Sequence, residues 1–91
     1  MSRPSPAGAR SQRAHLAHLD HSIIALIRQR TEICLELAAL RRAEGGPAIE
    51  LARENEVLRR YHDALGPSGT SVALLLTELG RRAEGAVRAV E

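Results

Sequence analysis

One arginine interrupts an otherwise apolar helical stripe in the first half of this sequence. Apolar side chains recur at alternating steps of three and four residues from Leu16 to Leu40, and Arg30 stands where that alternation requires an apolar residue. Arg41 follows eleven residues later, about 20° away around a helix and ~16 Å along its axis. The planar donor fork of arginine suits the capture of carboxylate or phosphate. Two such forks on one helix face predict a binding site for a small anion.

A second pair of charged residues, Arg53 and Glu54, is expected to reach the same interhelical space. An isolated arginine in a seam more often reaches out to solvent or pairs with an acid such as Glu54. Here three cations and one acid exceed what the protein can itself neutralise, which favours a compact dianion as the ligand. Arg13 points about 100° away from Arg30 and lies ~25 Å from it along the helix. In an antiparallel pair of long helices, however, Arg13 could enter the groove of a second copy.

The stripe predicts one long helix from residue 11 or 12 to about Glu44. It ends at "EGGP", which supplies glycines for a C-terminal cap and a proline that cannot continue the helix. Some thirty helical residues span ~45 Å, which the rest of a 91-residue chain cannot cover. A chain of this size buries only ~60 to 70% of its unfolded surface. The sequence therefore predicts an all-α, three-helix protomer with a long N-terminal helix, and a homodimer.

Two shorter helices complete the expected fold. The second is predicted over residues 49–64 and ends at "LGPSG". The third is predicted to begin near Thr70 or Ser71, either of which is a suitable N-cap. Gly80 and Gly85 each cost about 1 kcal/mol relative to alanine in a helix. Residues beyond about 80 are therefore expected to fray, or to become ordered on binding a partner.

The composition limits the class of protein. All thirteen basic residues are arginine, Phe and Trp are absent, Tyr61 is the one aromatic residue, and the net charge is +2. The single cysteine, Cys34, rules out an intramolecular disulfide, and no apolar run approaches the ~20 residues of a membrane span. Residues 1–10 are expected to be a disordered tail, which leaves residues 11–91 as one domain. These features predict a soluble, cytoplasmic protein.

Several motifs stand at the order and spacing of a known family. They are "RAHLAHLD" (13–20), "LIRQR" (26–30), Arg41 and "ARE" (52–54), in a register without gaps. On these residues the sequence resembles the all-helical chorismate mutases, and "RRYHDALGP", "VALLL" and "LGR" resemble the short intracellular subclass, so the resemblance covers about residues 12–85. It implies an isomerase of the shikimate pathway and of aromatic amino acid biosynthesis, which converts chorismate to prephenate without metal or cofactor. The family fold is an intertwined homodimer whose two sites each borrow an arginine from the other chain.

The chemistry of this reaction matches the residue types. Chorismate carries two carboxylates, and negative charge builds on its ether oxygen as the carbon–oxygen bond breaks. Fixed cations and a constrained substrate conformer both lower the barrier. The resemblance implies carboxylate-binding roles for Arg13 of the partner chain, Arg30 and Arg53. It implies catalytic roles for Arg41, Glu50 and Glu54.

Within the catalytic set, the resemblance gives Arg41 contacts with both a carboxylate and the ether oxygen. Glu50 and Glu54 would accept a hydrogen bond from the hydroxyl at ring carbon four, although many members have Asp in place of Glu50. Many members also place Gln or Glu of the third helix against the ether oxygen. This chain has no glutamine beyond the long helix. Glu84, as a protonated acid, or Arg81 is expected to substitute.

Other enzymatic activities and partners fit the same residues. A mutase for 4-amino-4-deoxychorismate, in a specialised pathway, would place an ammonium against Glu50 and Glu54. A related fold removes pyruvate from isochorismate. In the short subclass the C-terminal segment is set by a partner, the synthase that begins the shikimate pathway, and a weak end of the third helix is compatible with such a complex.

Non-enzymatic classes fit less well. A helical module that binds nucleic acid or protein could use the "RR" pairs at 41, 59 and 81, but acids are interspersed throughout and no aromatic platform exists for stacking. His15, His18 and His21 step by three along one helix, yet they lack nearby carboxylate or cysteine support for a metal, so a solvated stripe is expected. Neither nucleic acid nor membrane is therefore predicted as a partner.

Overall fold

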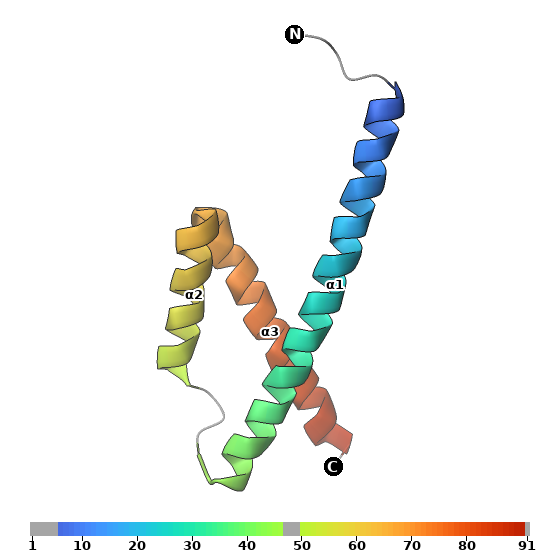
Figure 1. The fold of residues 1–91 in the computed structure, drawn as a ribbon. Helices are drawn as coiled ribbons and strands as arrows, with labels where there is room; N and C mark the ends of the chain where they lie inside the picture. The colour runs from blue at the N-terminus through green and yellow to red at the C-terminus, as the bar shows by residue number, and fades with distance from the viewer. Residues whose placement is uncertain (1–5, 47–49, 91) are drawn as a thin grey trace.

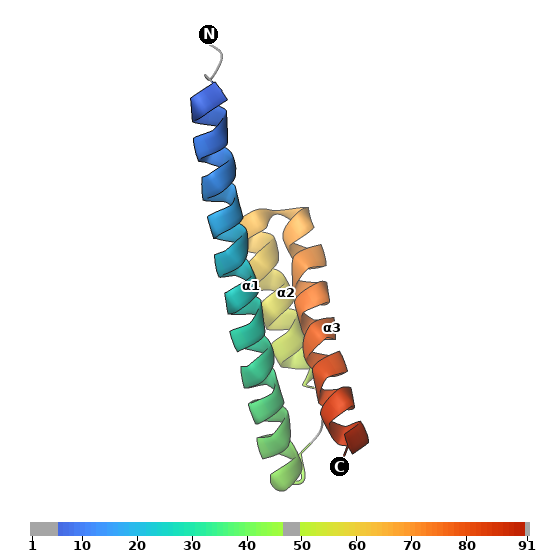
Figure 2. The ribbon, with the colours of Figure 1, turned by 90° about the vertical axis from the view of Figure 1, so that its right-hand side faces the viewer.

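The structure is a computed structural model that describes residues 6–46 and 50–90. It consists of three helices, α1 (Pro6–Ala43), α2 (Leu51–Leu65) and α3 (Pro67–Val90), and contains no strand within the described ranges. The prediction of an all-α protomer with a long N-terminal helix is confirmed. α2 and α3 form a hairpin in which α3 packs against the C-terminal half of α1 and α2 stands away from α1, while the N-terminal half of α1 projects beyond the hairpin (Figures 1 and 2).

α1 is longer at its start than predicted. It begins at Pro6, so residues 6–10 form its first turns and the expectation of a disordered tail is wrong for them; residues 1–5 lie outside the described part of the chain. Proline is tolerated at the first helical position because its missing N–H would have no intrahelical partner there. The C-terminal end of α1 has the glycine cap that the sequence predicts. Gly45 adopts φ +75°, and the N–H of Gly46 donates to a carbonyl of the last turn at 2.8 Å.

α3 begins earlier than predicted. Its first residue is Pro67, again at a position that needs no N–H donor, and Gly66 makes the preceding turn with φ +78°. The helix then continues to Val90, so residues 81–90 are helical in the structure. Gly80 is buried, and packing at this glycine offsets its poor helix propensity.

The α2–α3 hairpin depends on a second glycine. Gly69 is buried, and a Cβ placed there would lie 2.0 Å from the carbonyl oxygen of Tyr61. No residue with a side chain allows the two helices to approach so closely. α2 itself starts at Leu51, and the predicted first residue, 49, lies outside the described residues.

One chain covers little of its own apolar surface. The buried apolar residues are Ala38, Ala73 and Leu76. The radius of gyration is 18.0 Å, whereas a compact domain of this length would have about 12 Å. Large apolar side chains with at least 43% exposure lie along the whole of α1: Leu16, Leu19, Ile23, Ile24, Leu26, Ile33, Leu37 and Leu40. No helix in the described part of the chain is both long enough and apolar enough to cross a membrane.

Candidate active site

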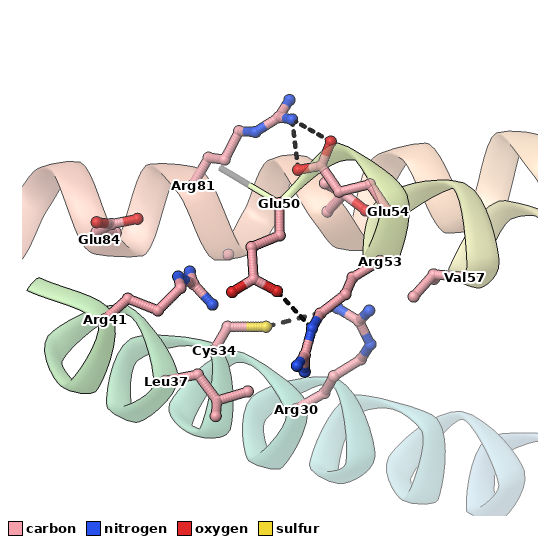
Figure 3. A pocket seen from close by; sticks show the side chains of 12 residues that line it. Arg30, Cys34, Leu37, Arg41, Glu50, Arg53, Glu54, Val57, Arg81 and Glu84 are labelled. Carbon is pink, nitrogen blue, oxygen red and sulfur yellow. Dashed lines mark hydrogen bonds and ion pairs between the residues drawn. The ribbon is translucent and has the colours of Figure 1, made fainter. Parts of the chain in front are cut away.

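A pocket of about 250 Å³ lies where α1, the start of α2 and α3 meet. Its charged lining residues are Arg30 and Arg41 from α1, Glu50, Arg53 and Glu54 at the start of α2, and Arg81 and Glu84 from α3. These residues are seven of the eight that the sequence suggested for the site. Figure 3 shows the two arginines of α1 on one side of the pocket and the residues of α2 and α3 on the other.

Arg30 and Arg41 reach the pocket together because α1 is a continuous helix through both positions. Their separation of about three turns places them on nearly the same face. Arg30 Nη1 lies 3.8 Å from the sulfur of Cys34, one turn further along. The predicted shared face of the two arginines is thus confirmed.

Two ion pairs hold the carboxylates on the α2 side. Arg81 Nη2 donates to Oε1 and Oε2 of Glu54 at 2.6 and 2.8 Å, which links α3 to α2. Glu50, the residue before α2, pairs with Nε of Arg53 one turn later. Each of these acids therefore has an arginine partner within the same chain (Figure 3).

A close helix crossing brings α3 to the pocket. A Cβ on Gly80 would lie 3.3 Å from Cβ and 3.4 Å from Sγ of Cys34. The missing side chain lets α3 approach α1 at this point, so that Arg81 and Glu84 on the following turn face the pocket. Cys34 is half-buried and lines the pocket.

Glu84 lies at the Arg41 end of the pocket (Figure 3). Its Oε1 is 4.0 Å from Nη1 of Arg42, and only 17% of its side chain is exposed. Arg42 belongs to α1 and stands outside the lining residues. The C-terminal parts of α1 and α3 are therefore joined by charge as well as by packing.

Sequence reasoning missed two lining residues of α3, Thr77 and Gly80. Positions 77, 80, 81 and 84 recur at helical spacing on one face, so this signal was available once the register of α3 was known. Arg13, the eighth suggested residue, is exposed on the projecting half of α1 and does not line the pocket. This agrees with its predicted absence from the groove of its own chain.

A second cavity of about 310 Å³ adjoins the first and shares Arg30 and Val57 with it. Its other lining residues belong to α2: Arg60, Tyr61, Ala64 and Leu65. No group of three or more His, Cys, Asp or Glu side chains capable of holding a metal occurs among residues 6–46 and 50–90. His15, His18 and His21 are exposed.

Comparisons with known proteins agree with this architecture. Residues 12–86 match the family model of chorismate mutase type II. The chain is 45% identical over 69 residues to an intracellular chorismate mutase of Mycolicibacterium smegmatis, and 39% identical over 69 residues to that of Mycobacterium tuberculosis. These alignments cover 76% of this chain and 66% and 65% of the two relatives, so the chain spans slightly less than two thirds of their length.

A solved structure has the same fold. It is a non-covalent complex of DAHP synthase and chorismate mutase from Corynebacterium glutamicum with a bound transition state analog. The likeness has a TM-score of 0.79 and 25% identity, and it covers 82% of this chain and 90% of the other. The helical architecture, the family model and the relatives agree, and the chain belongs to the chorismate mutase type II family.

Proposed function

We propose that this chain is a chorismate mutase, an isomerase that converts chorismate to prephenate in aromatic amino acid biosynthesis. The observation that carries the proposal is the pocket in which Arg30 and Arg41 face charged residues of α2 and α3. A small dicarboxylate needs several fixed guanidinium donors, and this pocket contains four. Membership of the family supports the same activity.

The charged residues that line the pocket have distinct roles in this proposal. Arg30 and Arg53 bind substrate carboxylates, and Arg41 reaches both a carboxylate and the ether oxygen. Glu50 and Glu54 accept a hydrogen bond from the ring hydroxyl. Arg81 or Glu84 supplies the contribution of α3, and Glu84 lies at the same end of the pocket as Arg41.

The pocket accelerates the reaction by two physical effects. The fixed cations stabilise the charge that develops on the ether oxygen more than they stabilise the ground state. The arginine contacts hold the folded substrate conformer, which removes much of the entropic part of the barrier. Enzymatic accelerations begin near ~10⁶-fold, or about 8 kcal/mol, and these two effects supply that amount.

The charge balance of the pocket favours a contribution from a second chain. Four arginines and three glutamates line it, so one chain leaves one net positive charge for a ligand that carries two negative charges. Arg13 of a partner chain would supply the missing charge. Its position on the projecting half of α1 suits such a role, because that half extends beyond its own α2–α3 hairpin (Figure 1).

An intertwined homodimer would also cover the exposed apolar stripe of α1. Monomeric proteins rarely leave contiguous apolar surface of this extent open to water. Leu16, Leu19 and Ile23 lie on the projecting half, and each is at least 45% exposed. The adjoining cavity beside Tyr61 could receive side chains of a partner helix next to the pocket.

The same family membership supports two further elements of the proposal. The related Corynebacterium glutamicum mutase is part of a complex with DAHP synthase, and this chain forms a similar complex with a synthase of that type. The relatives are named as intracellular enzymes, and we place this chain in the cytoplasm.

A single assay tests the activity. The purified protein is incubated with chorismate, and loss of substrate absorbance is followed with and without a candidate synthase. Turnover without added metal or cofactor is expected, together with faster turnover in the presence of the synthase. Absence of turnover under both conditions would refute the proposed function.

A further inference from the structure

The carboxylates on the α2 side of the pocket are neutralised by arginines of the same chain. Glu54 receives two hydrogen bonds from Arg81 Nη2, at 2.6 and 2.8 Å, and Glu50 pairs with Arg53. The Arg81–Glu54 pair joins two helices and is partly protected from water, with 45% and 27% of the side chains exposed. This part of the pocket therefore carries two acids and two cations.

Such a pair can still accept a hydrogen bond from a substrate. Each carboxylate oxygen has two lone pairs, and the guanidinium group uses one of them on each oxygen. A neutral hydroxyl that donates to Glu54 gains a charge-assisted hydrogen bond and meets no repulsion. The guanidinium group also fixes the orientation of the carboxylate, which lowers the entropic cost of that contact.

An ammonium group in the same place meets a different environment. Its attraction to Glu54 is opposed by repulsion from Arg81, which lies directly against the same carboxylate. Arg53 has the same effect beside Glu50, and Arg30 and Arg41 add positive charge from α1. The remaining acid, Glu84, lies at the Arg41 end and is close to Arg42. The described lining residues therefore provide no excess negative charge that would stabilise a cationic substituent on the ring.

We propose that Arg81 is a specificity-determining residue, whose ion pair with Glu54 makes the site select a substrate with a neutral hydroxyl over one with an ammonium group. This inference rests on the proposed mutase activity and names its substrate class: chorismate rather than 4-amino-4-deoxychorismate. Arg81 acts through Glu54 as a positioning residue. It need not touch the atoms that react.

The test compares kcat/KM for the two substrates. The unchanged protein is expected to prefer chorismate. Arg81→Gln removes the cation and should shift the ratio toward the amino substrate by about tenfold or more, equivalent to about 1.4 kcal/mol. Arg81→Lys keeps the charge and should retain most of the preference, because a single nitrogen, Arg81 Nη2, makes both contacts with Glu54.

A neighbouring arginine provides the matched control. Arg82 on α3 pairs with Glu78 at 3.1 Å, is 75% exposed and does not line the pocket. Arg82→Gln removes the same charge from the same helix and should leave the substrate ratio unchanged. Circular dichroism of all variants checks that the helices remain folded.

The outcomes separate this inference from the proposed function. Lack of turnover of either substrate by the unchanged protein refutes the mutase activity itself. Turnover with a preference for the amino substrate, or an unchanged ratio in Arg81→Gln, overturns the role of Arg81 alone. An equal loss of several orders of magnitude for both substrates would also overturn it, because Arg81 would then act on the reacting atoms. If Arg81→Gln fails to fold, Arg81→Lys and the preference of the unchanged protein still test the inference, since a preference for the amino substrate in either overturns it.

Discussion

Three glycines of α3 differ in what surrounds them, and substituting each with alanine tests the packing of this helix. At Gly69 a Cβ would lie 2.0 Å from the carbonyl oxygen and 2.6 Å from the carbonyl carbon of Tyr61, and 2.9 Å from Cβ of Leu65. At Gly80 the nearest atom would be Cβ of Cys34, at 3.3 Å. At Gly85 nothing lies within 4 Å. The same substitution therefore meets a backbone clash, a tight contact and open space.

These distances set the expected changes in the free energy of unfolding. Alanine in place of glycine gains about 0.5 to 1 kcal/mol in a helix interior. Gly85→Ala should stabilise the protein by about 0.5 kcal/mol, since it lies near the helix end, where the gain is smaller. Gly69→Ala should destabilise it by about 2 kcal/mol or more, because overpacking costs ~1 to 3 kcal/mol and backbone atoms yield least. Gly80→Ala should change stability by less than about 1 kcal/mol, because Cys34 can move by a few tenths of an ångström.

Thermal unfolding followed by far-UV circular dichroism measures these differences. One kcal/mol corresponds to about 4 to 8 °C in a domain of this size. Gly69→Ala should therefore lower Tm by roughly 8 °C or more, and Gly85→Ala should raise it by a few degrees. All variants are compared at one protein concentration, since association contributes to apparent stability. Equal Tm values for Gly69→Ala and Gly85→Ala would show that the close approach of α3 to Tyr61 is wrong.

Three further predictions concern the site. Arg41→Ala should lower kcat by about 10²- to 10³-fold while size-exclusion chromatography gives the same elution volume as for the unchanged protein; retained activity would contradict its assigned role. Arg13→Ala and Arg30→Ala should each be inactive, yet an equal mixture after subunit exchange should recover about a quarter of full activity, since half of the dimers are mixed and one of their two sites is intact. No recovery would contradict sites shared between chains. Glu84→Gln, which places an N–H donor at the same position, should retain turnover that Glu84→Ala loses; equal activity of the two would exclude Glu84 from contact with the ether oxygen.

Much of the fold follows from local rules that the sequence displays. The periodic stripe and the glycines after Glu44 were sufficient to predict the body and the end of α1. Arg30 and Arg41 could be placed on one face because both belong to one uninterrupted helix. Charge placement within a single helix is thus accessible from sequence alone.

The sequence predictions differ from the structure at the helix starts and at the contact between α1 and α3, which local sequence patterns do not determine. Pro6 and Pro67 each begin a helix, although the sequence pattern around both predicts an irregular segment; a proline is compatible with either a helix start or a turn. Propensity predicted fraying around Gly80, but the close contact with Cys34 makes a small residue favourable there. The register of α3 against the pocket depends on this contact, which the sequence does not reveal.

The ion-pair partner of Glu54 is also not evident from the sequence. It determines whether Arg30 is available to bind a ligand. From sequence, Glu54 could have neutralised Arg30, which would have made Arg30 a structural residue. In the structure the Glu54 carboxylate is occupied by two hydrogen bonds from Arg81. Among the described residues Arg30 forms no ion pair, and its nearest acceptor is the sulfur of Cys34 at 3.8 Å, a weak one. Arg30 therefore has no acidic partner in the described part of the chain, as the proposed binding of a substrate carboxylate beside Arg41 requires.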